Sequence, residues 1–254
     1  MINLLKEGFA KAKVSKRFWV CTAIIAAFSV LAAILTRFIE NSDNDISEKA
    51  TALNILFNML GSQSLFMAIV PAMLVVRDFT QNTVRNKIIC GCSRTSIYLA
   101  HSIVFSAIAL FYHFVSIAFA FAAGVPLLGM GDINSGCFAY SMGTSVLTIL
   151  AYASLTLFLV MIFRTVSGVI IAYVINSMLS VVSMLVMGLA KNDKVNELVN
   201  SLILDMQATI LNESMASQSY PEGMMKTMIP VVALCYIIVL PIIGIRLFKK
   251  ADLK

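Results

Sequence analysis

Residues 139–190 read AYSMGTSVLTILAYASLTLFLVMIF-RT-VSGVIIAYVINSMLSVVSMLVMGLA, and this stretch decides the fold. It holds two apolar runs, Ala139–Phe163 and Val166–Ala190, and neither run contains Asp, Glu, Lys or Arg. A helix of about 20 apolar residues crosses the ~30 Å hydrocarbon core of a bilayer, so each run is long enough to span a membrane. Because only Arg164 and Thr165 separate them, the runs predict two membrane-spanning helices in a tight antiparallel hairpin.

Four further apolar runs extend this pattern along the chain: Phe18–Thr36, Ala52–Val76, Tyr98–Ala123 and Thr227–Phe248. Of the 254 residues, 59% are hydrophobic and 13% charged, whereas soluble domains average about 45–50% apolar and about 25% charged. The runs are continuously apolar rather than alternating, which excludes a transmembrane β-barrel. The sequence therefore predicts an all-α membrane protein, with six transmembrane helices in a single domain over residues 1–254 and the first run retained as a span.

The distribution of basic residues orients the six predicted spans. An even number of spans leaves both termini on one side, together with the segments that follow the second and fourth runs. That side carries 14 of the 19 Lys and Arg residues. Basic residues concentrate in the cytoplasmic segments of membrane proteins, so both termini are predicted to be cytoplasmic. Because these charges are spread over four short segments instead of one dense patch, they do not indicate nucleic-acid binding.

Two segments outside the spans show the spacing of amphipathic helices. Residues 1–17 place Ile2, Leu5 and Phe9 on one face, which predicts an interfacial helix; a simple basic flank is the alternative. The segment Lys191–Lys226 predicts one external amphipathic helix, which lies on or dips into the outer leaflet before the last span. Its apolar residues at helical spacing are Val195, Leu198, Val199, Leu202, Ile203, Met206 and Ile210.

Motifs for catalysis, metal binding and nucleotide binding are missing from the sequence. There is no Gly-x4-Gly-Lys-Ser/Thr loop for ATP and no His-Glu-x-x-His pair for zinc. His101 and His113 lie out of phase on one predicted helix, and Cys90-Gly91-Cys92 lacks the spacing of a zinc pair. The cores of the spans hold no charged residue, which argues against coupling to an ion gradient and for energy supplied from outside the membrane. We expect no catalytic residue, metal ion or cofactor on this chain.

Uncharged polar residues form a stripe on each of two predicted spans. They recur three or four residues apart, which places them on one face of each helix. Such stripes hold helices together through interhelical hydrogen bonds, or they face a substrate path, and the sequence leaves both alternatives open. The residues assigned to a path are Asn54, Asn58 and Ser62 on the second span and Tyr173, Asn176 and Ser180 on the fifth.

The segment between the second and third spans carries a recognisable motif. It reads DFTQNTVRNKIICGCSRTSIY over Asp78–Tyr98, and it resembles the corresponding stretch of permeases from bacterial ABC exporters of the second type. The tail LFKKADLK over Leu247–Lys254 is similar to the Phe-Lys-x-x-Asp-Leu ending of that family. Two positions depart from the pattern: the usual Glu is Asp78, and the usual Gly before Thr83 is Asn82. After Gly, Asn is the residue that best tolerates a left-handed conformation, so we expect the turn to survive.

The resemblance implies a short cytoplasmic coupling helix that docks into a separate ATPase subunit. Its composition fits this role, with Ile88 and Ile89 predicted on one side and Arg85 and Lys87 near them to pair with acidic groups of the partner. A helix that merely lies on lipid is the alternative. The residues implied in coupling are Asp78, Phe79, Asn82, Thr83, Arg85, Lys87 and Arg94.

By the same resemblance, we expect the chain to be the permease subunit of a two-component ABC exporter in the plasma membrane of a bacterium. Two copies, or one copy with a related permease, would associate with two cytoplasmic ATPase subunits that hold ATP and Mg. The expected cargo is an amphipathic antimicrobial peptide, such as a phenol-soluble modulin or a lantibiotic. The alternatives are an exporter of drugs, lipids or glycans, and a non-transporting membrane sensor or intramembrane enzyme.

Overall fold

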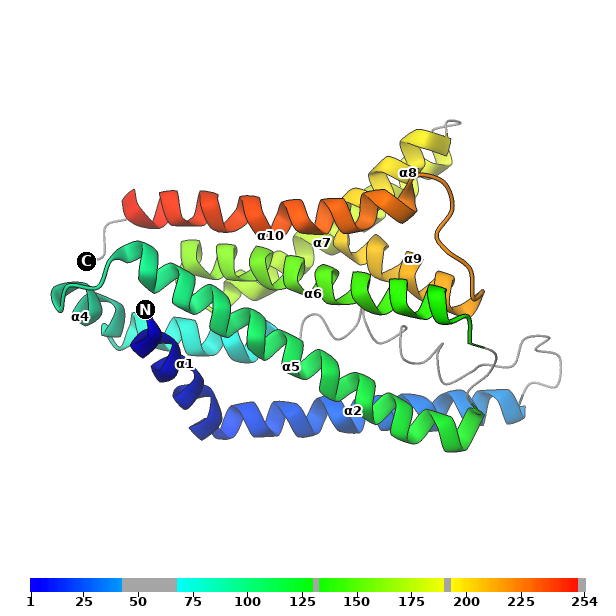
Figure 1. Cartoon of the computed structure of the whole chain (residues 1–254), viewed down its shortest axis with the longest axis horizontal. Helices are drawn as coiled ribbons and strands as arrows, with labels where there is room; N and C mark the ends of the chain where they lie inside the picture. The colour runs from blue at the N-terminus through cyan, green and yellow to red at the C-terminus, as the bar shows by residue number, and fades with distance from the viewer. Residues whose placement is uncertain (43–67, 130–132, 190–192, 251–254) are drawn as a thin grey trace.

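The computed structural model describes residues 1–42, 68–129, 133–189 and 193–250, and the regular elements in these ranges are all helices (Figure 1). Five of these helices are long and apolar enough to cross a membrane. An all-α membrane protein is therefore confirmed. The five helices are α2 (Lys16–Ser42), α5 (Arg94–Leu128), α6 (Ser135–Phe163), α7 (Ser167–Leu189) and α10 (Met225–Lys250).

Each of these five helices contains one of the predicted apolar runs, apart from small shifts at the ends. The remaining run, Ala52–Val76, lies mostly outside the described residues. Its last part is described, and residues 68–80 form a helix that leads into the motif segment. The total of six spans accordingly stays a prediction.

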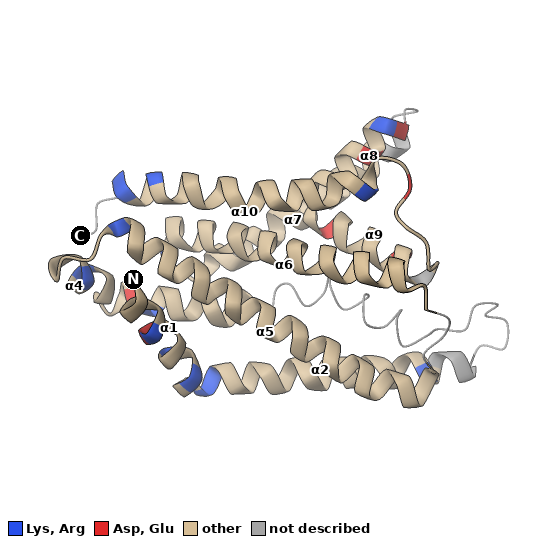
Figure 2. Cartoon of the chain, viewed as in Figure 1, with Lys and Arg blue, Asp and Glu red and all other residues tan. Residues whose placement is uncertain are grey.

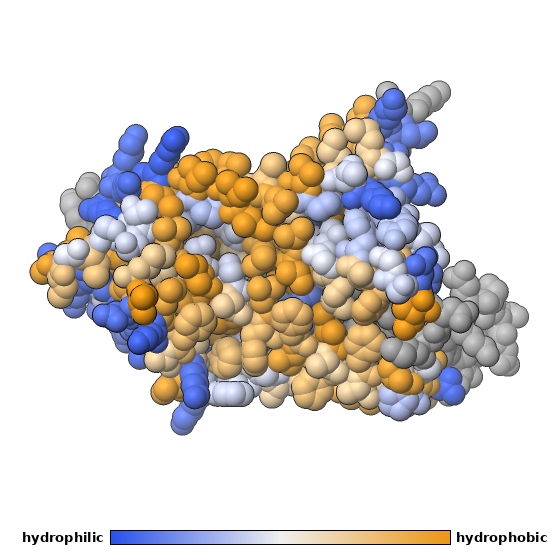
Figure 3. Space-filling model, in the orientation of Figure 1, coloured by the Kyte–Doolittle hydropathy of each residue, from blue (hydrophilic) through white to orange (hydrophobic). Residues whose placement is uncertain are grey.

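The long helices run side by side, and the N-terminus and the last turn of α10 lie at the same end of the bundle (Figure 1). The helices α1 (Ile2–Val14) and α4 (Thr83–Ile89) lie at this end as well. Lys and Arg residues gather there, and we call it the basic end (Figure 2). An apolar surface separates it from the hydrophilic opposite end, which is the distribution expected of a chain that crosses a bilayer (Figure 3).

Helix α6 forms the centre of the bundle, where it packs against α5, α7, α9 and α10. Small and hydroxyl side chains, among them Ser141, Ser145 and Thr148, are buried along its length. Small residues let neighbouring helix backbones approach closely inside a membrane, where apolar side chains gain little by leaving lipid. Small side chains therefore allow α6 to occupy the interior of the bundle. Large apolar residues of the surrounding helices, such as Phe114 of α5 and Leu185 of α7, face outward.

The predicted hairpin between the fourth and fifth runs is present as α6 and α7, which pack against each other. Arg164 ends α6 in a left-handed conformation, with φ 55°. Gly168 then lies so close to the preceding helix that a Cβ atom on it would be 2.8 Å from the backbone N and Cα of Val160. Because that distance is too short for a side chain, glycine is what permits so tight a connection.

The external segment differs from the single amphipathic helix that we predicted. It forms two helices, α8 (Asp193–Leu202) and α9 (Leu204–Ala216), separated by Ile203 in an extended conformation. Gln207 stabilises this break, because its Nε2 donates a 2.7 Å hydrogen bond to the carbonyl oxygen of Ser201. The helix α8 packs on α10, and α9 packs on α6. Helix α9 therefore lies within the bundle, with Leu204, Ala208 and Leu211 buried, whereas Ser201 is the one buried residue of α8.

Candidate functional site

The motif segment forms a tight turn at the basic end, between the helix that ends at residue 80 and α4 (Thr83–Ile89). Asn82 makes this turn in the left-handed region, with φ 53° and ψ 17°. Few residues other than Gly adopt these angles readily, and Asn is among them. The prediction that Asn82 preserves the turn is confirmed, and Thr83 follows it as the first residue of α4.

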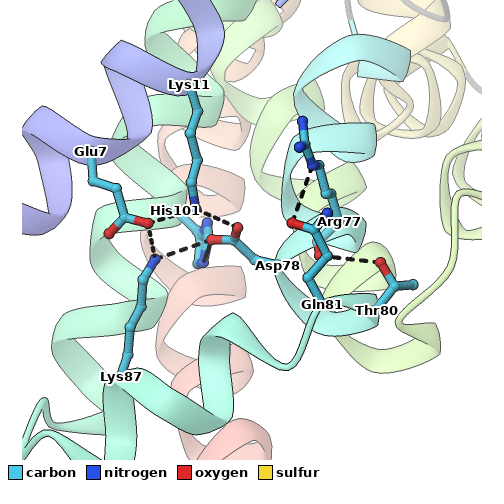
Figure 4. Close-up of polar contacts among 8 residues, drawn as sticks. All are labelled: Glu7, Lys11, Arg77, Asp78, Thr80, Gln81, Lys87 and His101. Carbon is cyan, nitrogen blue, oxygen red and sulfur yellow. Dashed lines mark hydrogen bonds and ion pairs between the residues drawn. The ribbon is translucent and has the colours of Figure 1, made fainter.

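Charged side chains from three helices meet next to this turn, together with His101 from α5 (Figure 4). The Asp78 carboxylate accepts hydrogen bonds from Lys11 Nζ at 2.7 Å and from Lys87 Nζ at 3.1 Å, and His101 Nε2 lies 3.6 Å from it. Glu7 bridges the two ammonium groups, at 2.5 Å from Lys11 and 3.1 Å from Lys87. We call these five residues the Asp78 cluster. It joins α1, the helix over residues 68–80, α4 and α5 at one point.

The electrostatics of this cluster favour the charged forms of Glu7, Lys11 and Asp78. The Asp78 side chain is only 5% exposed. Burial alone would raise the pKa of this carboxyl, but the hydrogen bond from Lys11 and the positive charge of Lys87 outweigh it and hold the pKa below the ordinary value of 3.8. Burial would likewise lower the pKa of Lys11, whereas its hydrogen bonds to Asp78 and Glu7 raise it above 10.5. The ion pairs therefore persist across the neutral range.

Fewer side chains of α4 face away from the bundle than the sequence predicted. Val84 is buried and Ile88 packs toward the core, whereas Arg85 is exposed and Ile89 is 73% exposed. Successive helical residues are 100° apart, so Ile88 and Ile89 do not share a side as we had predicted. The Lys87 side chain is only 13% exposed, because it points into the Asp78 cluster. Arg85, Asn86 and Ile89 are the exposed side chains of this helix, and Arg85 and Ile89 lie one turn apart on it.

Two other motif residues hold the end of α10. The Phe79 ring meets the Phe248 ring edge-on, with 6.3 Å between their centroids. Arg94 Nη1 donates hydrogen bonds to the carbonyl oxygens of Phe248 at 3.3 Å and Lys249 at 2.8 Å, which belong to the last turn of α10. Carbonyl groups at a helix C-terminus lack partners within the helix, and an arginine there satisfies them. The motif thus fastens the C-terminal turn of α10 to the base of α5.

The structure places the assigned path residues of α7 unequally. Tyr173 is exposed, whereas Asn176 is 3% exposed and its Nδ2 donates a 2.7 Å hydrogen bond to the Tyr152 hydroxyl of α6. Ser180 donates to the carbonyl oxygen of Asn176 at 3.1 Å. The bond to Tyr152 joins α7 to α6, as the packing alternative requires of Asn176, whereas the Ser180 bond lies within α7. The other three assigned path residues, Asn54, Asn58 and Ser62, lie outside the described residues.

A part-buried acidic contact was missed by the sequence prediction. The Tyr152 hydroxyl that accepts from Asn176 also donates a 2.7 Å hydrogen bond to Asp205 Oδ1, from α9. Asp205 lies in the segment Lys191–Lys226, which the sequence predicted to be external, and it was assigned no partner. A signal was available, since Asp205 interrupts an otherwise apolar stretch from Leu202 to Met206. The result is a polar junction of Tyr152, Asn176 and Asp205 where α6, α7 and α9 meet.

The arrangement defines an all-α membrane protein with a charged cluster and a short outward-facing helix at its basic end. Within the described ranges, no group of three His, Cys, Asp or Glu side chains is placed to hold a metal ion. Residues 14–254 match a family described as "Protein of unknown function (DUF2705)", and the chain belongs to that family. No curated protein matches the chain.

Proposed function

We propose that this protein is the transmembrane permease subunit of a two-component ABC exporter. In this proposal α4 and both termini lie in the cytoplasm of a bacterium, and ATP and Mg bind a separate ATPase subunit that docks on α4. The observation that carries the proposal is α4 itself, a short helix that presents Arg85 and Ile89 outward while its inner side is fastened to the bundle. The resemblance of Asp78–Tyr98 to exporter permeases supports the same role.

The contacts around α4 suit a helix that transmits force. A push on α4 reaches α1 and the helix over residues 68–80 through Lys87 and the Asp78 cluster. It reaches α10 through the Phe79–Phe248 contact and the Arg94 hydrogen bonds. Coupling between distant sites needs packed or hydrogen-bonded elements of this kind, which move as units. Two such subunits, identical or related, would then rearrange around a path for cargo.

For the cargo we propose an amphipathic peptide, on the resemblance alone. The five candidate spans carry few charged groups that could couple transport to an ion gradient, so we propose that the energy comes from ATP. Because the sequence has no nucleotide-binding motif, the ATP is proposed to bind the separate ATPase subunit. The polar junction at Asp205 lies where the external helices meet α6 and α7, so it belongs to the packing of those helices in this proposal.

The proposal is tested by isolating the tagged protein from its native membrane and identifying what remains bound. We expect an ABC ATPase to co-purify with the wild type. Arg85→Glu should reduce the retained ATPase by about tenfold or more, because it places a like charge against the acidic groups of a partner. Lys13→Glu is the matched control, since Lys13 is an exposed base on α1 at the same end. If no ATPase is retained by the wild type, or if both variants retain it equally, the proposal is wrong.

A further inference from the structure

A cleft of about 660 Å³ opens at the basic end, on the side of the helix over residues 68–80 away from the Asp78 cluster. One wall is the elbow where α1 ends and α2 begins, including Lys16 and Arg17. The other wall is formed by residues 70–81 of the neighbouring segment, including Arg77. Sites of 300–1,000 Å³ are typical of small-molecule ligands, so the cleft is large enough to hold one.

The mouth of this cleft is positively charged. Lys16, Arg17 and Arg77 are all exposed, and no carboxylate in the described part of the chain forms an ion pair with any of them. Arg77 Nε donates instead to Gln81 Oε1 at 3.2 Å, and Arg17 Nη1 lies 3.8 Å from the Met73 sulfur. Figure 4 shows Arg77 directed away from the carboxylate of its neighbour Asp78. Three cations therefore line the mouth of the cleft, and no acid is among the described residues that line it.

The inner part of the cleft is apolar. Val70, Met73 and Leu74 line it, on the helix that leads inward from Arg77. The change from charged to apolar lining falls at the depth where α2 begins as a candidate span at Lys16. Trp19, one turn further along α2, is exposed, as expected of an aromatic residue at a membrane–water interface. The cleft thus combines a basic mouth with an apolar wall at the level of lipid headgroups.

We propose that this cleft binds an anionic phospholipid. The phosphate lies among Lys16, Arg17 and Arg77, and an acyl chain follows the wall at Val70 and Met73. Guanidinium groups match phosphate oxygens with two parallel hydrogen bonds, and the N-terminus of α2 adds its positive partial charge. A free phosphate ion would make no use of the apolar wall, whereas the acyl chain of a phospholipid would pack against it. We therefore favour a phospholipid over inorganic phosphate as the ligand. This inference does not rest on the proposed transport function.

The test uses the full chain in a neutral detergent, titrated with dioleoyl-phosphatidylglycerol and followed by native mass spectrometry. Dioleoyl-phosphatidylcholine serves as the lipid without net charge. At about 1 kcal/mol for each basic residue near an anionic lipid, Arg17→Gln/Arg77→Gln should weaken binding of phosphatidylglycerol by about 25-fold. The control Arg246→Gln/Lys250→Gln removes the same charge from the exposed end of α10 and should change binding less than twofold.

Two further arms separate lipid from free phosphate and from misfolding. Inorganic phosphate at millimolar concentration should not displace the lipid, because it cannot use the apolar wall. Arg17→Lys/Arg77→Lys keeps the charge and the fold but loses the paired hydrogen bonds, so it should weaken binding by only a few-fold. The proposal would be overturned if the two lipids bound equally, or if the cleft and control variants lost phosphatidylglycerol binding equally. Complete displacement of the lipid by inorganic phosphate would overturn it as well.

Discussion

The contact that fixes α4 to the bundle is tested by Asp78→Asn. This change removes the charge of a side chain that is 5% exposed and that accepts from Lys11 and Lys87. Leaving a fully buried charge without its partner costs about 3–5 kcal/mol. Here the two lysines keep Glu7, and the Lys11 side chain is 35% exposed to screening solvent, so we expect a loss of about 2 kcal/mol.

The assay is thermal unfolding of the purified protein in detergent, followed by far-UV circular dichroism. For a chain of this size, about 2 kcal/mol corresponds to a fall in Tm of about 4–8 °C. Glu222→Gln, an exposed acid at the opposite end, is the control and should leave Tm unchanged. Lys87→Met should also lower Tm, whereas Arg85→Met should not, because only Lys87 points inward. A Tm for Asp78→Asn within 1 °C of the wild type would refute this account of the cluster.

The remaining predictions concern pH and packing. The pKa of Asp78 is lowered, so its stabilising effect is present above the ordinary pKa of 3.8 and is lost as pH falls through the lower folded value; Asp78→Asn should flatten the acid side of a Tm–pH curve, and an unchanged curve would contradict this. Gly168→Ala should cost about 1–3 kcal/mol by pushing a methyl group against the Val160 backbone, measured as a fall in Tm that the exposed control Gly143→Ala does not show. Tyr98→Phe should leave Tm equal or higher by the equivalent of up to about 1 kcal/mol, because the buried Tyr98 hydroxyl has no hydrogen-bond partner among the described residues; a clear fall would mean that it does. Asn176→Leu should speed hydrogen exchange in α9 while costing only about 0.6 kcal/mol, and unchanged exchange would remove the polar junction from the packing of α9.

The spans and the turn at α4 could be predicted from sequence because their causes are local. Continuous apolar runs determine membrane helices, and five of them coincide with α2, α5, α6, α7 and α10. The left-handed conformation of Asn82 follows from the properties of that single residue. In both cases the residues that determine the structure are adjacent in the chain.

The partners of the site residues could not be predicted in this way. Lys87 was expected to face a partner subunit, but its ammonium group pairs with Glu7 and Asp78. The contact between Lys11 and Asp78 joins residues 67 positions apart, and helical periodicity says which residues share a face, not what that face meets. The apolar neighbours of Asp205 indicated that its side chain is partly buried, but they do not say that it meets Tyr152, which is 53 positions away. The break at Ile203, where α9 begins, has no local signal comparable to Gly or Pro.

The most direct test of the proposed function is photocrosslinking from α4 in the native cell. A benzophenone amino acid replaces Ile89, which is 73% exposed at the basic end, and the matched control position is Leu189, which is exposed at the far end of α7. We predict a light-dependent product at Ile89 that contains an ABC ATPase subunit, and none at Leu189. Products at Ile89 that contain only lipid, in cells where the protein is inserted normally, would contradict the docking role of α4.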